Sequence, residues 1–320
     1  MTQSAMHQET DESVEAVLRS ELAHGDAVIA TVAPILRHLL ANDDHSVFSD
    51  EIIARVRGMF GDVSRQLLNA AASASGGVED REPDPAQTEA LAIALAGVPS
   101  LLGHAHSLAL EWQLTERLHA RLGLDPVLSP LIQALIASSD PATATSAMQL
   151  LAAQARFAQT QRRMQLPLGE LPGDLLHGAL LALREAIADV ETSSIAQAET
   201  TIRDNFDEAR SRAGLIARLV TGMGGGAVAA LSVGHAGVAM FLSALALSSG
   251  QDRDMAVLAT NEGQLARLAL ALRAAGLKPA AVEEQFVSLH PEIALPPGFE
   301  NLGADRAAAL LAVSGSYPVT

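Results

Sequence analysis

The stretch LDPVLSPLIQALIASSDPATATSAMQLLAAQ, residues 124–154, decides the fold class. It contains the pairs Asp125-Pro126 and Asp140-Pro141, in which an acid that caps a helix precedes a proline suited to the first helical turn. The carboxylate satisfies backbone N–H groups that have no partner at a helix start, and the proline ring presets φ. We therefore expect helices at about 126–138 and 141–164.

Helical spacing of apolar residues continues on both sides of this stretch. Leu176, Leu180, Leu183 and Ile187 recur every three or four residues and predict a core-facing stripe. Pro34 should kink or split a helix, and 193–218 reads as an amphipathic region. The remaining expected helices are 11–23, 26–41, 49–73, 101–122, 172–189, 227–248, 253–260, 261–275, 279–289 and 303–314.

The composition agrees with an all-α fold. The chain has 60 Ala and 47 Leu among 320 residues, and aromatic residues make up 3%. Ala and Leu favour helices, whereas strands are rich in β-branched and aromatic residues. We expect a multi-helix bundle or an irregular HEAT-like helical stack.

Residues that interrupt helices predict the domain organisation. The segment SASGGVEDREPDPA, residues 73–86, crowds Gly, Pro and acids together and is typical of a linker. We expect a disordered N-terminus (1–10), an N-terminal helical unit (11–73), an acidic Pro/Gly linker (74–86), a main helical body (87–314) and a tail (315–320).

The helices expected after Asp125 and Asp140 together span about 40 residues, close to the length of a HEAT-type helix pair. Residues 123–135 are echoed faintly by 276–289, so an irregular stack fits better than a regular solenoid. The run at 124–154 and LALALRAAGLKP at 268–279 resemble a bacterial family of unknown function with helical, HEAT-like architecture. This resemblance covers the latter three-quarters of the chain. It implies a fold, and it carries no activity, cofactor or site residue.

Charge and cysteine content exclude several classes of function. The net charge is −16, and Lys278 is the only lysine, which argues against nucleic-acid binding because that relies on a basic surface. The chain has no Cys, which excludes disulfides and thiolate metal sites. The N-terminus lacks the basic and apolar regions of a secretory signal, so we expect a cytoplasmic protein.

The longest uncharged stretch is residues 219–251. Its segment 227–247 is long enough to cross a bilayer, but it is rich in Ala, Gly and Ser, so we expect a buried core helix and no membrane partner. Gly222, Gly226, Ala230 and Gly234 lie four residues apart and predict a close helix approach. The Gly-rich turn at 222–227 lacks the preceding strand of a dinucleotide site.

Histidines offer the only hints of catalysis. His104 and His106 are two residues apart, which places them about 200° apart on a helix and argues against a shared metal ion. Either could serve in phosphotransfer if its imidazole were exposed; otherwise they are ordinary surface or flanking histidines. His177 and His235 are further possible bases, but Ser232 lacks a nucleophile elbow. We predict no catalytic, metal or cofactor-binding residue.

Two sets of residues remain as candidate sites. Arg156, Arg162 and Arg163 form a basic cluster that would dock an acidic partner, although cations near a helix end are common without any function. Trp112, the only Trp, continues an apolar seam; it would be a core residue or a wall of a pocket that also includes Gly224 and His235.

The resulting hypotheses are ranked by how little each assumes. The first is a non-enzymatic helical scaffold or regulatory protein that acts through protein–protein contacts, with a protein partner or a homodimer. The second is a protein that binds a small hydrophobic molecule or a lipid. The third is a phosphotransfer or hydrolytic enzyme that uses histidine.

Overall fold

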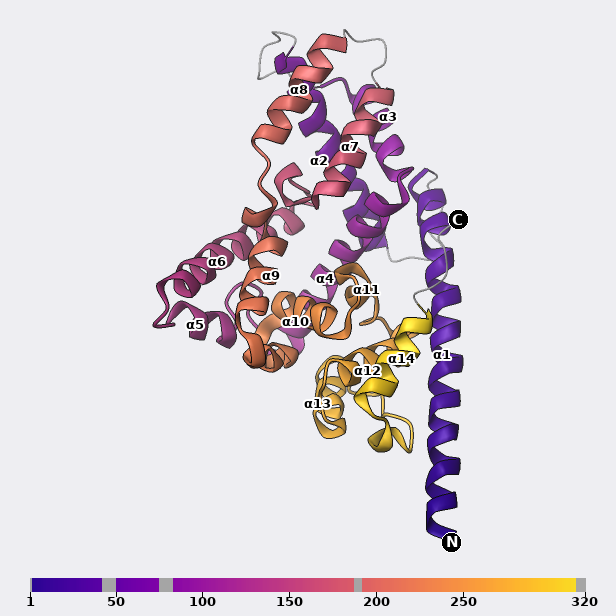
Figure 1. Ribbon diagram of the computed structural model, residues 1–320. Coiled ribbons are helices and arrows are strands. Elements are labelled where there is room, and N and C mark those ends of the chain that lie inside the picture. Colours follow the sequence, from indigo (N-terminus) through magenta and orange to yellow (C-terminus); the bar gives the residue numbers. More distant parts are fainter. Residues whose placement is uncertain (1, 42–49, 75–82, 187–191, 315–320) are drawn as a thin grey trace. The chain divides into compact units, whose positions relative to one another are not determined.

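The computed structural model describes residues 2–41, 50–74, 83–186 and 192–314 (Figure 1). Every regular element in these ranges is a helix, which confirms the all-α prediction. The chain divides into two compact units: unit 1 contains Met1–Val32, Gln113–Met148 and Ile216–Thr320, and unit 2 contains Ala33–Trp112 and Gln149–Leu215. The division falls within four helices: α1 (Thr2–Ala41), α4 (Pro99–Leu122), α6 (Pro141–Arg162) and α9 (Arg212–Gly222).

This division differs from the expected order of an N-terminal unit, a linker and a main body. Within unit 2, α2 (Asp50–Ala74) packs against three helices from beyond the expected linker: α3 (Pro85–Ala96), α7 (Gly173–Ala186) and α8 (Thr192–Asp204). An amphipathic helix such as α2 must cover its apolar face, and these distant helices provide the cover. Residues 75–82 of the expected linker, and the tail 315–320, lie outside the described residues.

The N-terminal prediction was wrong in two respects. Helix α1 begins at Thr2, where disorder was expected, and continues through Pro34, where a break was expected. Proline removes one helical hydrogen bond. The buried face nevertheless continues along the helix, from Leu18 and Leu22 to Leu36, so apolar burial outweighs that local loss.

Helix α3 was not predicted: residues 85 and 86 were assigned to the linker, and 87–96 to the main body without a helix. Asp84 caps it by accepting a hydrogen bond from the Ala86 backbone N–H (3.2 Å), and Pro85 occupies the first turn. This is the same acid–proline signal that predicted the helices further along the chain.

Of the two helices predicted from the opening stretch, one is confirmed and one is shifted. Asp140 caps α6 by accepting from the Thr143 backbone N–H (3.0 Å). Asp125 instead holds a turn, and α5 (Pro130–Ile136) begins after Ser129, whose hydroxyl accepts from the Ile132 N–H. A helix starting at residue 126 would need an N–H at position 130, which Pro130 lacks.

The other expected helices agree to within a few residues at 49–73, 101–122, 279–289 and 303–314. The region 193–218 is divided into α8, the short 3₁₀ helix η2 (Glu208–Arg210) and the start of α9. The stripe of Leu176, Leu180 and Leu183 is buried in α7, and Ile187 lies outside the described residues.

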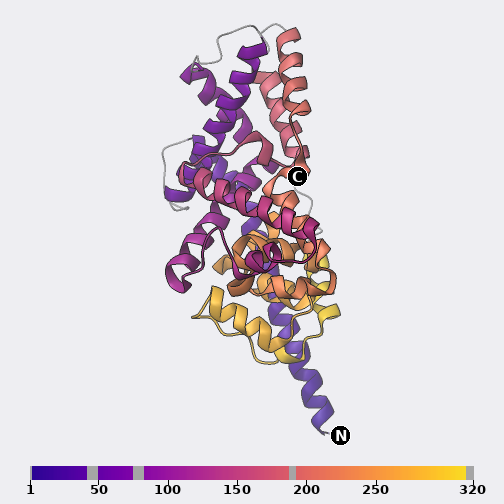
Figure 2. The same ribbon diagram turned by 90° about the vertical axis from the view of Figure 1, so that its left-hand side faces the viewer.

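In unit 2, α2 lies beside α3 and α8 in both views (Figures 1 and 2). A polar clasp joins α2 to the loop after α6. The Asp62 carboxylate accepts from the Leu166 backbone N–H (3.1 Å), and the Gln66 side-chain oxygen accepts from the Leu168 N–H (3.0 Å), at the start of the 3₁₀ helix η1 (Leu168–Glu170). Because these backbone groups are paired, the loop can lie against the helix without leaving buried amides unsatisfied.

In unit 1, α10 (Val233–Ser249) is the central helix, buried over most of its length as the uncharged stretch predicted. The expected helix at 227–248 is in fact the 3₁₀ helix η3 (Gly224–Leu231) followed by α10, because Ser232 between them is extended. Around α10 pack α5, η3, α11 (Arg253–Leu258), α12 (Leu265–Ala274) and α13 (Pro279–Leu289). The short elements η4 (Glu262–Gln264) and η5 (Phe299–Asn301) precede α12 and α14 (Ala304–Ser314).

The part of α1 in unit 1 is tied to η4, α12 and α14 by polar contacts. The Gln264 side chain donates to the Gly25 carbonyl (2.7 Å), Arg267 pairs with Asp26, and Arg306 pairs with Glu15 through both carboxylate oxygens. Burial raises the pKa of Asp26 and lowers that of Arg267. The hydrogen bond and the charge attraction between the two side chains oppose both shifts. A Cβ at Gly25 would lie 2.6 Å from the Gln264 side-chain oxygen, so a larger residue there would require the Gln264 side chain to move.

The predicted glycine row does not form a helix contact. Gly222, Gly226 and Gly234 lie in three different elements, and a Cβ at Gly222 or Gly234 would meet open space. The constrained glycine is Gly237, with φ 72° and ψ 165° inside α10, where an added Cβ would lie 3.0 Å from the Ser129 Cβ.

We predict that Gly237→Ala lowers the free energy of unfolding by about 1–3 kcal/mol, because this backbone region is nearly exclusive to glycine. Gly234→Ala, in the same helix and exposed, should instead be neutral or stabilise by up to about 1 kcal/mol through helix propensity. Urea denaturation measures both. Equal effects of the two substitutions would contradict the role of Gly237.

Candidate ligand cavity

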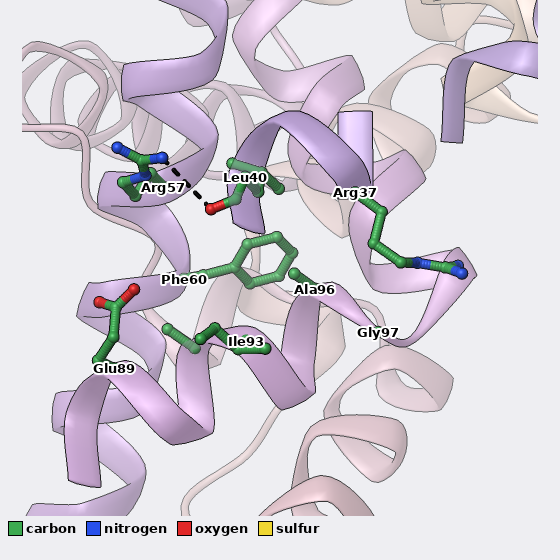
Figure 3. A pocket seen from close by; sticks show the side chains of 9 residues that line it. Arg37, Leu40, Arg57, Phe60, Glu89, Ile93, Ala96 and Gly97 are labelled. Atoms are coloured by element: carbon green, nitrogen blue, oxygen red, sulfur yellow. Dashed lines mark hydrogen bonds between the residues drawn. The ribbon is translucent and has the colours of Figure 1, made fainter. Parts of the chain in front are cut away.

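An apolar cavity of about 280 Å³ lies within unit 2, among the C-terminal end of α1, α2 and α3 (Figure 3). The ring of Phe60, a buried residue of α2, lies in the middle of this region. The lining residues are Arg37, Leu40, Arg57, Phe60, Glu89, Ala92, Ile93, Ala96 and Gly97.

The sequence of α3 explains why space remains here. Leu91 and Leu95 are fully buried, whereas Ala92 and Ala96 line the cavity with short side chains. Ile93 is 53% exposed although it is large and apolar. A helix that is apolar nearly all round has more apolar surface than its packing covers, and part of the surplus borders the cavity.

Three charged side chains surround this apolar surface. Arg57 donates to the carbonyl of Leu40 in the last turn of α1 (3.3 Å). Figure 3 shows Arg57 and Glu89 on one side of the cavity and Arg37 on the opposite side. The rim therefore has two positive groups and one negative group.

The lining residues are suited to binding rather than to acid–base chemistry. Guanidinium groups stay protonated at any physiological pH, and Glu89 is the only carboxylate that lines the cavity. Neither a paired base nor a hydroxyl nucleophile lines it.

The residues predicted from sequence as a pocket lie elsewhere. Trp112 is only 1% exposed in the core of unit 2, where its ring meets Phe157 edge-on at 6.2 Å between centroids. Gly224 and His235 are exposed residues of unit 1. None of the three lines the cavity described above.

The predicted basic cluster is at the surface. Arg156, Arg162 and Arg163 are all exposed at the C-terminal part of α6 and just after it. Arg162 also lies over the Trp112 ring, with 5.9 Å from its guanidinium carbon to the ring centroid. Part of this cluster therefore has a structural contact of its own.

The histidines do not meet the conditions set for catalysis. His104 and His106 are 9% and 4% exposed, so they are buried rather than surface residues, and the exposure needed for phosphotransfer is lacking. His177 is exposed and its Nδ1 lies 3.1 Å from the Arg203 Nη2. Because arginine only donates, this nitrogen accepts a hydrogen bond from Arg203.

The most buried charges in unit 2 form a structural ion pair. Both guanidinium nitrogens of Arg212 contact the Glu111 carboxylate, at 2.7 and 2.9 Å, and both residues are almost fully buried. The guanidinium also lies 3.6 Å from the centroid of the Phe157 ring, and Gln154 is within 3.4 Å. With its donors occupied in this way, Arg212 joins helices rather than facing a ligand.

In unit 1, the buried His290 is the titratable group with the most unusual surroundings. Its Nε2 has no hydrogen-bond partner, and the ring is tilted against Phe286. Burial lowers the pKa of His290, and Arg117 adds to the decrease; a backbone hydrogen bond with Thr260 and the charge of Glu262 oppose it, and Arg121 lowers it slightly. Because the imidazole is buried and its Nε2 lacks a partner, protonation of His290 should cost stability.

Among the described residues, no three His, Asp or Glu side chains are grouped closely enough to hold a metal ion. In the same ranges, no single helix has the length and apolar character needed to cross a membrane. Two pairs of consecutive helices, α3–α4 and α9–η3, reach that length and apolar character only when the two helices are taken together, and each pair is sharply bent between its helices.

The described residues form an all-α protein with an apolar cavity in unit 2. Comparison with known proteins assigns this chain to no family. No family model, curated protein or solved structure matches the chain. The resemblance to a HEAT-like family stays a prediction.

We predict that Glu111→Gln lowers the free energy of unfolding by about 3–5 kcal/mol, because the Arg212 charge stays buried without compensation. Replacing both residues by Met should recover part of this loss, since a matched apolar pair leaves no buried charge. Guanidinium denaturation gives both values. If the double variant is less stable than Glu111→Gln, the proposed structural role of the Glu111–Arg212 ion pair is wrong.

We also predict that His290 makes unit 1 less stable in acid. The unfolded imidazole, with its ordinary pKa of 6.5, takes up a proton at pH values where the folded one stays neutral. The free energy of unfolding should therefore fall as the pH falls below 6.5, and His290→Gln should reduce that slope, as measured by urea denaturation between about pH 7.5 and 5. The variant His235→Gln, which changes an exposed histidine, is the control and should keep the wild-type slope. If His290→Gln also keeps that slope, the role of His290 in acid sensitivity is refuted.

Proposed function

We propose that the protein binds a small apolar molecule in the cavity formed by α1, α2 and α3. The observation that carries the proposal is the composition of the cavity wall, in which six residues are apolar or glycine and three charged residues lie around them. Binding pockets for small molecules combine these features, and their volumes start at about 300 Å³. The cavity, at about 280 Å³, lies just below that range and therefore suits a small ligand.

The apolar wall sets how affinity should depend on the ligand. Each methylene that moves from water into the cavity contributes about 0.8 kcal/mol, which is about fourfold in affinity. This increase ends when the chain fills the available volume. A series of straight-chain alcohols of increasing length should therefore show rising affinity followed by a plateau.

A scaffold that acts through protein–protein contacts is the second candidate function. The exposure of Arg156, Arg162 and Arg163 favours it, because docking of an acidic partner requires accessible cations. The partner, the homodimer and the cytoplasmic location stay predictions.

We predict that Ala92→Leu lowers the affinity for 1-octanol at least about tenfold, because the added carbons fill the ligand space. Ala90→Leu is the matched control, since Ala90 is exposed on the same helix and does not line the cavity. Isothermal titration calorimetry measures binding to both variants and to the wild type. The proposal fails if the wild type does not bind the alcohol series, or if both variants bind as the wild type does.

A further inference from the structure

The charges at the rim of the cavity are unevenly placed. Arg57 and Glu89 share one side, so a ligand group there meets opposite charges that offset each other. Among the three charged lining residues, Arg37 is the only one on the other side. The positive potential at the mouth is therefore strongest near Arg37.

The two arginines also differ in whether they form hydrogen bonds with other described residues. Arg57 is held at the end of α1 by its hydrogen bond to the Leu40 carbonyl (3.3 Å). Arg37 is exposed, and within the described ranges it forms no hydrogen bond or ion pair with another residue. Its guanidinium can therefore contact a ligand at the mouth without breaking any contact with the described residues.

The charge of the cavity rim is opposite in sign to the charge of the whole protein. The protein has a net charge of −16, yet the cavity rim has a net charge of +1 from two arginines and one glutamate. A guanidinium binds a carboxylate through two parallel hydrogen bonds, a geometry that an alcohol cannot match. Charge complementarity at the mouth therefore favours a ligand with an anionic end.

We infer that the ligand is a small amphipathic carboxylate, such as a short- to medium-chain fatty acid. Its hydrocarbon tail lies on Phe60, Ala92 and Ala96, and its carboxylate lies at Arg37, away from Glu89. This inference rests on the proposed function, because it assumes that an apolar tail occupies the cavity, and it adds the chemistry of the head group.

The test compares octanoate with 1-octanol, which share a chain length and differ in the head group. Isothermal titration calorimetry at about pH 7, where the carboxylate is ionised, measures both ligands with the wild type, with Arg37→Gln and with Arg156→Gln. Arg156 is an exposed arginine of the same unit that does not line the cavity, so its variant controls for the change in net charge. Circular dichroism verifies that each variant is folded.

We expect Arg37→Gln to weaken octanoate binding about threefold to fivefold, as for a solvent-exposed ion pair, and to leave octanol binding unchanged. Arg156→Gln should leave both unchanged, and added salt should weaken octanoate binding to the wild type only. Octanol binding with an octanoate affinity insensitive to Arg37→Gln would overturn the inference and leave the proposed function intact. Failure of both ligands to bind the wild type would overturn the proposed function and, with it, the inference.

Discussion

The packing of α3 on α2 is the contact on which the cavity depends. Leu91 and Leu95 bury one face of α3 completely within unit 2, which fixes the rotation of the helix about its axis. That rotation turns the short side chains of Ala92 and Ala96 toward the end of α1, where larger residues would have closed the space. A chain with 3% aromatic residues has few side chains able to fill a junction of three helices, so a void at such a junction follows from composition as well as from geometry.

Local chemistry decided which parts of the fold could be predicted. Asp140-Pro141 led directly to α6, because capping depends only on neighbouring residues. The same signal at Asp84-Pro85 was present but was read as linker, since acids and glycines precede it. The cavity was beyond such reasoning because its lining combines α1, α2 and α3, and because alanine and leucine are too common here to mark a site. The apolar sequence ALAIALA at 90–96, with no polar face, was the available signal.

The buried ion pairs have a separate role in this core. Ala and Leu surfaces are much alike, so apolar packing by itself discriminates weakly between alternative helix registers. Glu111–Arg212 in unit 2 and Asp26–Arg267 in unit 1 each join helices far apart in sequence, and each would leave an uncompensated charge if the register changed. We interpret these pairs as selecting one arrangement among several of similar apolar burial. The desolvation that shifts the pKa values of Asp26 and Arg267 in opposite directions is the cost of that selectivity.

An acidic protein can bind an anionic ligand because electrostatic interactions weaken with distance. Charges separated by more than about 8–10 Å are largely screened at physiological ionic strength, so most of the net charge of −16 acts weakly at the cavity mouth. A carboxylate in contact with Arg37 is screened much less. The overall charge then slows the approach of anions without removing the attraction at short range, and an anion without an apolar tail gains too little from one exposed guanidinium to stay bound. Selectivity for an amphipathic anion therefore requires the cavity and the arginine together, since neither is sufficient by itself.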